Sequence, residues 1–201
     1  NRYDKDNRWW SAPYDNTNSY FTGFSHVNLS GVGCPELSSL LVMATTGDLD
    51  VDYHNYGTTY SDEHASPGLY GLKLDKYGIR AEATATARTG RIRFIFPEGK
   101  GNILLNLGEG LTNESGATVH RISDTEIAGC KLMGTFCYNP NAVFPLYFAM
   151  RVSKVPSDQG FWKFQRPKKG VEAEWDVDDA KYKIYPDFGK TISGDDIGGW
   201  Y

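Results

Sequence analysis

Alternation of apolar and polar residues is the main pattern in the middle of the chain. It is clearest over residues 79–88 and 91–96, with the turn residues Asp, Lys, Tyr and Gly at 75–78 ahead of the first run. A period of two places successive side chains on opposite faces of a strand. Such runs, separated by Gly, Pro, Asn and Asp, predict an all-β antiparallel sandwich with few or no long helices. Strands are predicted at 37–43, 69–74, 79–88, 91–96, 102–107, 117–122, 126–132 and 144–153.

The remaining stretches carry weaker patterns. Charge alternates with aliphatic residues over 48–52, which predicts an edge or surface strand. Residues 172–178 predict a last, acidic strand. The glycines and aromatic residues from 192 to 201 predict no complete strand, so we expect a domain taken from a longer protein and truncated at both ends. Loops are predicted at 1–18, 60–68 and 155–170, the last one rich in aromatic residues.

Residues 23–35 form the most unusual segment, with the sequence Gly-Phe-Ser-His-Val-Asn-Leu-Ser-Gly-Val-Gly-Cys-Pro. Its glycines allow positive φ and close approach of the backbone to a partner. His26, Asn28 and Ser30 alternate, so an extended backbone would present all three on one side, with Val27 and Leu29 anchoring the other side. This arrangement predicts a rigid binding loop. The alternative is a polar turn whose Ser and Asn side chains satisfy local backbone groups.

Composition limits the classes of function. The 201 residues suffice for one domain, and 40% hydrophobic with 14% aromatic residues is typical of a globular chain. A formal net charge of −4 without a basic cluster argues against a nucleic-acid partner. No apolar run approaches the roughly 20 residues of a membrane span. Abundant Tyr and Trp suit surfaces that stay partly wet, sugar sites among them.

Candidate catalytic groups are few. Among the four histidines, only His26 lies in a distinctive sequence context, whereas His120 is expected to be structural and His64 solvated. The aspartates at 48, 50 and 52 are expected to form a solvated face, because Tyr53 stands where a calcium-binding EF-hand loop needs glycine. No nucleophile elbow, P-loop or dinucleotide fingerprint is present. These observations favour a binding or scaffold module over a complete enzyme.

The three cysteines do not have the spacing of a zinc site. Cys130 and Cys137 lie on either side of Gly134, where a hairpin would bring them together as a disulfide. The alternative is that both stay free and pack as small apolar side chains.

The segment from Gly23 to Cys34 resembles the N-terminal domain of glycoside hydrolase family 92, the calcium-dependent exo-α-mannosidases. The resemblance implies a supersandwich of the galactose-mutarotase-like type, packed on a helical (α/α) barrel with the active site between them. Terminal α-mannose would be removed with inversion by carboxylic acids and a Ca²⁺ ion, all supplied by the barrel. Further resemblance lies at residues 40–47, 63–70, 77–86, 103–108, 145–148 and 153–154.

Residues 1–201 would then be one sandwich domain of a longer bacterial enzyme that is exported to the periplasm, the cell surface or the medium. Its partners would be the C-terminal helical catalytic domain and mannose-containing glycans, and the chain itself would hold no catalytic residue, metal or cofactor. The family often has His or Arg at the position of Asn28, so an ionic role is not expected there. The resemblance implies a sugar-facing wall made of Trp9, Trp10, His26, Asn28, Ser30, Gly31, Gly33 and Cys34.

Two other functions remain open from the sequence. One is a free-standing carbohydrate-binding module with a platform of Trp9, Trp10, Tyr14 and Trp162, because exposed aromatic rings stack on the apolar faces of sugars. The other is a purely structural sandwich that shapes the barrel and never touches sugar.

Overall fold

The structure is a computed structural model of the chain. It describes residues 19–28, 37–110, 114–133, 139, 141–165, 181–185 and 191–201, with only the backbone of residues 28, 114, 115, 165 and 181–185. Within these ranges the elements are β-strands apart from one helical turn, α1 (Tyr53–Tyr56), and the strands of each sheet pair antiparallel. The predicted all-β antiparallel sandwich is therefore confirmed.

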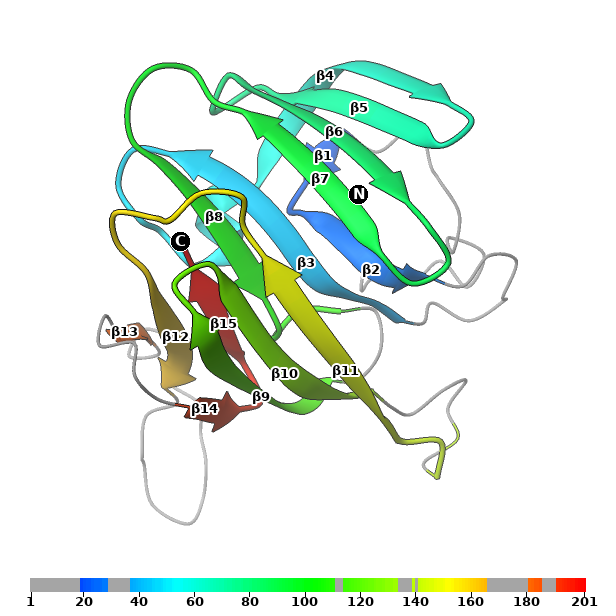
Figure 1. The fold of residues 1–201 in the computed structure, drawn as a ribbon, viewed down its shortest axis with the longest axis vertical. Coiled ribbons are helices and arrows are strands. Elements are labelled where there is room, and N and C mark those ends of the chain that lie inside the picture. The colour runs from blue at the N-terminus through cyan, green and yellow to red at the C-terminus, as the bar shows by residue number, and fades with distance from the viewer. Residues whose placement is uncertain are drawn as a thin grey trace.

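The strands form three sheets (Figure 1). The five-stranded sheet has the order β1 (Tyr20–Phe21), β4 (Thr58–Ser66), β5 (Leu69–Leu74), β6 (Ile79–Ala85), β7 (Gly90–Ile95). The six-stranded sheet has the order β13 (Lys181–Tyr185), β12 (Gly160–Gln165), β15 (Ile197–Trp200), β8 (Gly101–Asn106), β3 (Leu37–Thr46), β2 (Phe24–Asn28). The four-stranded sheet has the order β11 (Phe144–Arg151), β10 (Glu126–Met133), β9 (Glu114–Ser123), β14 (Thr191–Gly194).

The six-stranded sheet is the middle layer, because its two faces contribute to two separate cores. Leu104 and Trp162 pack with Leu72 and Ile79 of the five-stranded sheet. Their sequence neighbours Leu105 and Phe161 pack in the other core, with residues of the four-stranded sheet such as Val119 and Ile127. In Figure 1, β4–β7 lie on one side of the molecule and β9–β11 on the other. Burial on both faces explains why β3 and β8 read as continuous apolar runs rather than as alternating ones.

Two predictions about residues 48–68 are wrong. The aspartates at 48–52 form no strand but lead into α1, where the Asp52 carboxylate accepts a hydrogen bond of 3.0 Å from the His54 N–H. Short Asp side chains bind nearby backbone N–H groups and so compete with the ladder of a sheet. The predicted loop at 60–68 is mostly the strand β4, joined to β5 by a turn at Pro67 and Gly68. Its polar composition reflects exposure, since most of its side chains face water.

The region after residue 155 holds further corrections. The predicted aromatic loop contains β12, whose Trp162 is fully buried, so this side chain cannot serve as an exposed sugar platform. Residues 191–194 and 197–200 form β14 and β15, and β15 pairs with β12 on one side and β8 on the other. The prediction that no strand is completed after residue 192 is therefore wrong. The predicted loop at 1–18 and the acidic strand at 172–178 lie outside the described residues.

The predicted strands from residue 69 to 151 are largely confirmed, with shifts of a few residues at their ends. The largest shifts are of three residues: β9 begins at Glu114 instead of residue 117, and β6 ends at Ala85 instead of residue 88. The hairpin closes there because the Thr86 N–H donates to the Thr89 carbonyl oxygen over 2.8 Å. Cys130 carries a free thiol in β10, and Cys137 lies outside the described residues.

Candidate functional site

The first half of the unusual segment 23–35 is the edge strand β2, which pairs with β3. Between the pairs Phe24↔Val42 and His26↔Ser39, β3 contains one residue more than β2, which makes a β-bulge. Leu40 in this bulge has a φ of 57°. Bulges bend a strand and change the direction of its side chains, and they often lie next to functional sites.

Backbone strain gathers on both sides of residues 29–36. Val27 has a φ of 59° before this segment, and Leu37 and Ser38 have φ values of 67° and 53° after it. Left-handed backbone costs a non-glycine residue of order 1–3 kcal/mol and persists where the surrounding structure imposes it. Val27 is also 38% exposed, so the expectation that it anchors the segment in a core is wrong.

His26 joins two sheets at this corner. Its ring Nδ1 lies 2.9 Å from the Leu40 carbonyl oxygen, and because a carbonyl only accepts, Nδ1 must carry the proton. The ring lies against Gly90, at the start of β7: a Cβ atom on Gly90 would be 2.6 Å from His26 Nε2. The half-buried imidazole therefore connects the bulge of β3 with the edge strand of the five-stranded sheet.

Only part of the predicted sugar-facing wall can be placed. His26 and the backbone of Asn28 lie in β2, where Asn28 pairs with Leu37. The predicted residues outside the description are Trp9, Trp10, Ser30, Gly31, Gly33 and Cys34. Of the other histidines, His64 is exposed on β4, as expected of a solvated group, and His120 lies in β9.

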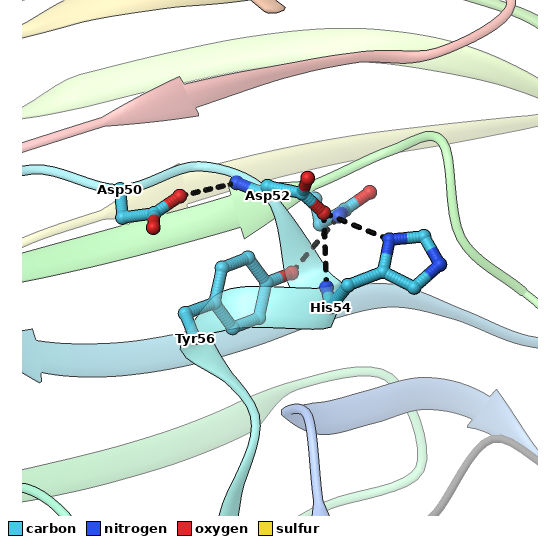
Figure 2. Close-up of polar contacts among 5 residues, drawn as sticks. Asp50, Asp52, His54 and Tyr56 are labelled. Carbon is cyan, nitrogen blue, oxygen red and sulfur yellow. Dashed lines mark hydrogen bonds and ion pairs between the residues drawn. The ribbon is translucent and has the colours of Figure 1, made fainter. Parts of the chain in front are cut away.

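The sequence analysis missed a polar group that borders the core between the five- and six-stranded sheets. It consists of Tyr56, Asn106 and the backbone N–H groups of Gly108 and Glu109. The Asn106 side-chain amide donates to the Tyr56 hydroxyl over 2.9 Å, and its oxygen accepts from the backbone N–H groups of Gly108 and Glu109. Figure 2 shows Tyr56 beside the Asp50–Asp52–His54 contacts, in which the Asp52 carboxylate also lies 2.9 Å from His54 Nδ1. The available sequence signal was a polar Asn at the end of the apolar strand β8.

Burial raises the pKa of two tyrosines in this region, Tyr53 and Tyr56. Burial, followed by the negative charges of Glu109, Asp196 and Asp52, raises the pKa of Tyr53 to about 12. Burial also raises the pKa of Tyr56 above its usual range. Both effects disfavour a phenolate. The hydroxyls therefore act as hydrogen-bonding groups at neutral pH and not as charged ones.

Two side chains from neighbouring segments contact the backbone of residues 107 and 108, next to this polar group. Asp196, between β14 and β15, packs so closely on Gly108 that a side chain at position 108 would overlap its carboxylate. The buried Lys131 of β10 donates to the Leu107 carbonyl oxygen.

Among the described residues, no group of three or more His, Cys, Asp and Glu side chains is arranged to hold a metal ion. No helix in the described part of the chain is long and apolar enough to cross a membrane.

Comparison with protein families identifies the fold. The model of the glycosyl hydrolase family 92 N-terminal domain matches residues 2–200. The chain belongs to this family. The family 92 resemblance inferred from the segment at Gly23 is therefore confirmed over nearly the full length of the domain.

Solved structures agree with the assignment of this family 92 domain. A family GH92 α-mannosidase from Bacteroides thetaiotaomicron, solved in complex with mannoimidazole, is 26% identical and superposes with a TM-score of 0.75 over 98% of this chain. The GH92 family glycosyl hydrolase ccman5 is 25% identical, with a TM-score of 0.70 over 93% of this chain. The domain spans only 26% and 24% of these two proteins. A comparison with curated proteins gives no match.

Proposed function

We propose that this domain is the N-terminal part of an inverting exo-α-mannosidase and forms one wall of its mannose site. The observation that carries the proposal is the match of residues 2–200 to the family 92 N-terminal domain. The structural likeness to an α-mannosidase solved with mannoimidazole supports it. Because the domain spans about a quarter of that enzyme, we infer that a companion helical domain completes the site.

Residues 23–35 are our candidate for the sugar-facing segment. The strained residues Val27 and Leu37 support this role, because strain of this kind persists at binding sites that must hold a fixed shape. In the proposed wall, the backbone at Gly31 and Gly33 approaches the sugar closely, with Asn28, Ser30 and Cys34 beside it. Trp9 and Trp10 supply aromatic rings that stack on the apolar face of a pyranose.

His26 is proposed to fix the position of this wall. Its Nδ1 proton is committed to Leu40, which leaves Nε2 as an acceptor at the corner between β2 and β7. One ring can thus connect β3 with β7 and hold this edge of the sandwich in place.

The companion domain would supply the hydrolytic chemistry. Inversion requires a carboxylic acid that protonates the leaving oxygen and a carboxylate that activates water, about 6.5–9.5 Å apart. We assign both groups, and a Ca²⁺ ion that would polarise the sugar hydroxyls, to the companion domain. The substrates are proposed to be mannose-containing glycans outside the cytoplasm, which requires that the enzyme is exported.

The test compares residues 1–201 with the full-length enzyme that contains them, both assayed with 4-nitrophenyl α-mannoside and with α-linked mannobioses. We expect turnover from the full-length enzyme only. In that enzyme, Trp10→Ala and His26→Ala should lower kcat/KM, whereas His64→Ala, a change on the exposed strand β4, should not. Mannoside hydrolysis by residues 1–201 alone would refute the division of labour between the domains. Tight mannoside binding by residues 1–201, abolished by Trp10→Ala, would instead favour a free-standing binding module.

A further inference from the structure

Over strands β10 and β11, the outer face of the four-stranded sheet carries few of the polar residues expected on a water-facing sheet. On the inner face, Ile127 of β10 and Phe148 of β11 pack in the core beneath. The side chains that alternate with them point outward. An antiparallel sheet with one solvated face normally carries polar residues on that face. Here the outward residues of β10 and β11 are Ala128, Cys130, Leu132, Pro145, Tyr147 and Ala149, which we call the β10–β11 strip.

The β10–β11 strip is continuous across the two strands. Its members lie directly opposite each other as the pairs Ala128↔Ala149, Cys130↔Tyr147 and Leu132↔Pro145. Tyr147 is 76% exposed, which makes it the most exposed large hydrophobic residue in the described part of the chain. The neighbouring outward residues of β9 are polar and border the strip: His120 lies opposite Ala128, and Thr118, opposite Cys130, shares a hydrogen bond of 2.8 Å with Ser193 of β14.

Charge appears only at one end of the β10–β11 strip. There the Arg151 guanidinium pairs with the Glu126 carboxylate at 2.6 Å. An uncharged centre that contains an aromatic residue, with a polar rim, is the composition of a protein–protein interface. Aromatic side chains such as Tyr also supply much of the binding energy at such interfaces.

The outer face of the five-stranded sheet gives an internal comparison. Its outward residues in β6 and β7 include Arg80, Glu82, Arg91 and Arg93, and Arg93 lies 3.6 Å from Glu82. Lys73 of β5, directly opposite Arg80, continues this charged surface. The outer face of the five-stranded sheet is therefore charged across several strands, whereas on β10 and β11 the charge is confined to the pair Glu126–Arg151. The difference indicates that the two faces meet different surroundings.

We propose that the β10–β11 strip is the docking surface for an α-helical face of the companion domain. This inference rests on the two-part enzyme of the proposed function. The superposed α-mannosidase is about four times longer than this domain, since the domain covers 26% of it, so a large companion is available to cover the sheet. The small side chains of Ala128 and Ala149 permit close approach of a helix. The exposed side chain of Tyr147 would insert between the side chains of that helical face. A charged outer layer, as on the five-stranded sheet, would lose its hydration in such a contact.

Thiol labelling tests the proposal directly, because Cys130 lies within the β10–β11 strip. The rate of maleimide labelling at Cys130, read by peptide mass spectrometry, is compared between residues 1–201 and the full-length enzyme. An Ala149→Cys variant adds a more exposed probe on the same face, and Ile95→Cys gives a matched probe on the five-stranded sheet. We expect the two strip probes to be labelled at least about tenfold more slowly in the full-length enzyme, because labelling there requires local opening. The Ile95→Cys probe should react equally in both proteins.

A disrupting variant completes the test. In the full-length enzyme, Tyr147→Arg should restore fast labelling of Cys130, whereas Ile95→Arg should not. Equal labelling rates in the two proteins would overturn the proposal. Protection that grows with the concentration of residues 1–201 alone would show a second copy as the occupant, and protection by added mannan would show a glycan; either result would also overturn it. The labelling ratio does not depend on whether the enzyme hydrolyses mannosides, so failure here is distinct from failure of the proposed function.

Discussion

The contact between His26 and Gly90 makes a quantitative prediction about a single methyl group. A Cβ atom at position 90 would lie 2.6 Å from His26 Nε2 and 2.9 Å from Cδ2, closer than side-chain atoms pack. The imidazole is held on its other side by the hydrogen bond to Leu40, so it cannot simply turn away. Gly90→Ala should therefore force the ring from its place. Such overpacking typically costs about 1–3 kcal/mol.

A compensating gain must be subtracted from this cost. The φ of Gly90 lies outside the left-handed region, so alanine fits the backbone there. Alanine in place of glycine within a strand gains roughly 0.5–1 kcal/mol. The net destabilisation should then be about 0.5–2 kcal/mol, when the two low ends and the two high ends of those ranges are subtracted. For a domain of this size, that corresponds to a loss of roughly 1–8 °C in Tm.

A double-mutant cycle with His26→Ala separates the contact from other effects. With the imidazole removed, Gly90→Ala should stabilise the domain by roughly 0.5–1 kcal/mol instead of destabilising it. The coupling energy, measured by urea unfolding of the four proteins, should thus be about 1–3 kcal/mol. A coupling energy below about 0.5 kcal/mol, the usual limit for independent sites, would refute the contact as the reason for glycine at position 90.

Three further predictions concern the polar group of Tyr56 and Asn106 and the buried tyrosines. Tyr56→Phe should cost about 1–2 kcal/mol in urea unfolding, because the buried Asn106 amide loses its acceptor. Asp52→Ala should cost about 0.5–2 kcal/mol through loss of the cap on α1, seen as a lower Tm. Burial raises the folded-state pKa of Tyr53 and Tyr201 from 10.0 to about 12, so the stability they contribute is complete below pH 10 and lost as pH rises toward about 12. Circular dichroism during an alkaline titration should show unfolding in that window.

For each of these predictions, a specific result would contradict the explanation given. The hydroxyl of Tyr147 is exposed, so Tyr147→Phe should leave the urea midpoint unchanged; an equal loss in both Phe variants would rule out the Asn106 explanation. Asp48→Ala serves as the control for the cap, and a matching loss of Tm there would point to general charge effects. A free energy of unfolding that stays constant up to pH 12 would contradict the burial of the tyrosine hydroxyls.

The strands with regular alternation were the part of the fold that sequence predicted best. In β6 and β7, Ile79, Ala81, Ile92 and Phe94 recur at every second position because only one face of the five-stranded sheet packs against a core. A period of two carries this information locally. The family resemblance at Gly23–Cys34 was equally local, since it needs only neighbouring residues.

The strands that were missed depend on distant partners. In β15, a methyl group at Gly198 would overlap the Trp162 indole, so glycine is needed there although glycine is rare in strands. The alternation rule cannot find such a strand, because its reason lies on β12. The candidate site shows the same limit. His26 stood out by its context, whereas Gly90 and the pair Tyr56–Asn106 owe their roles to contacts between distant segments.

The position of β15 in the six-stranded sheet constrains the order of events during synthesis. β8 and β12 do not pair with each other, and each pairs with β15. Until residues 197–200 leave the ribosome, the middle layer consists of two separate pieces, β2–β3–β8 and β12–β13. The edge of β8, with its buried Leu104 and Leu105, stays open during that time, and open apolar edges invite pairing with other chains. Completion of the middle layer therefore waits for β15, which covers the open edge of β8 and joins it to β12.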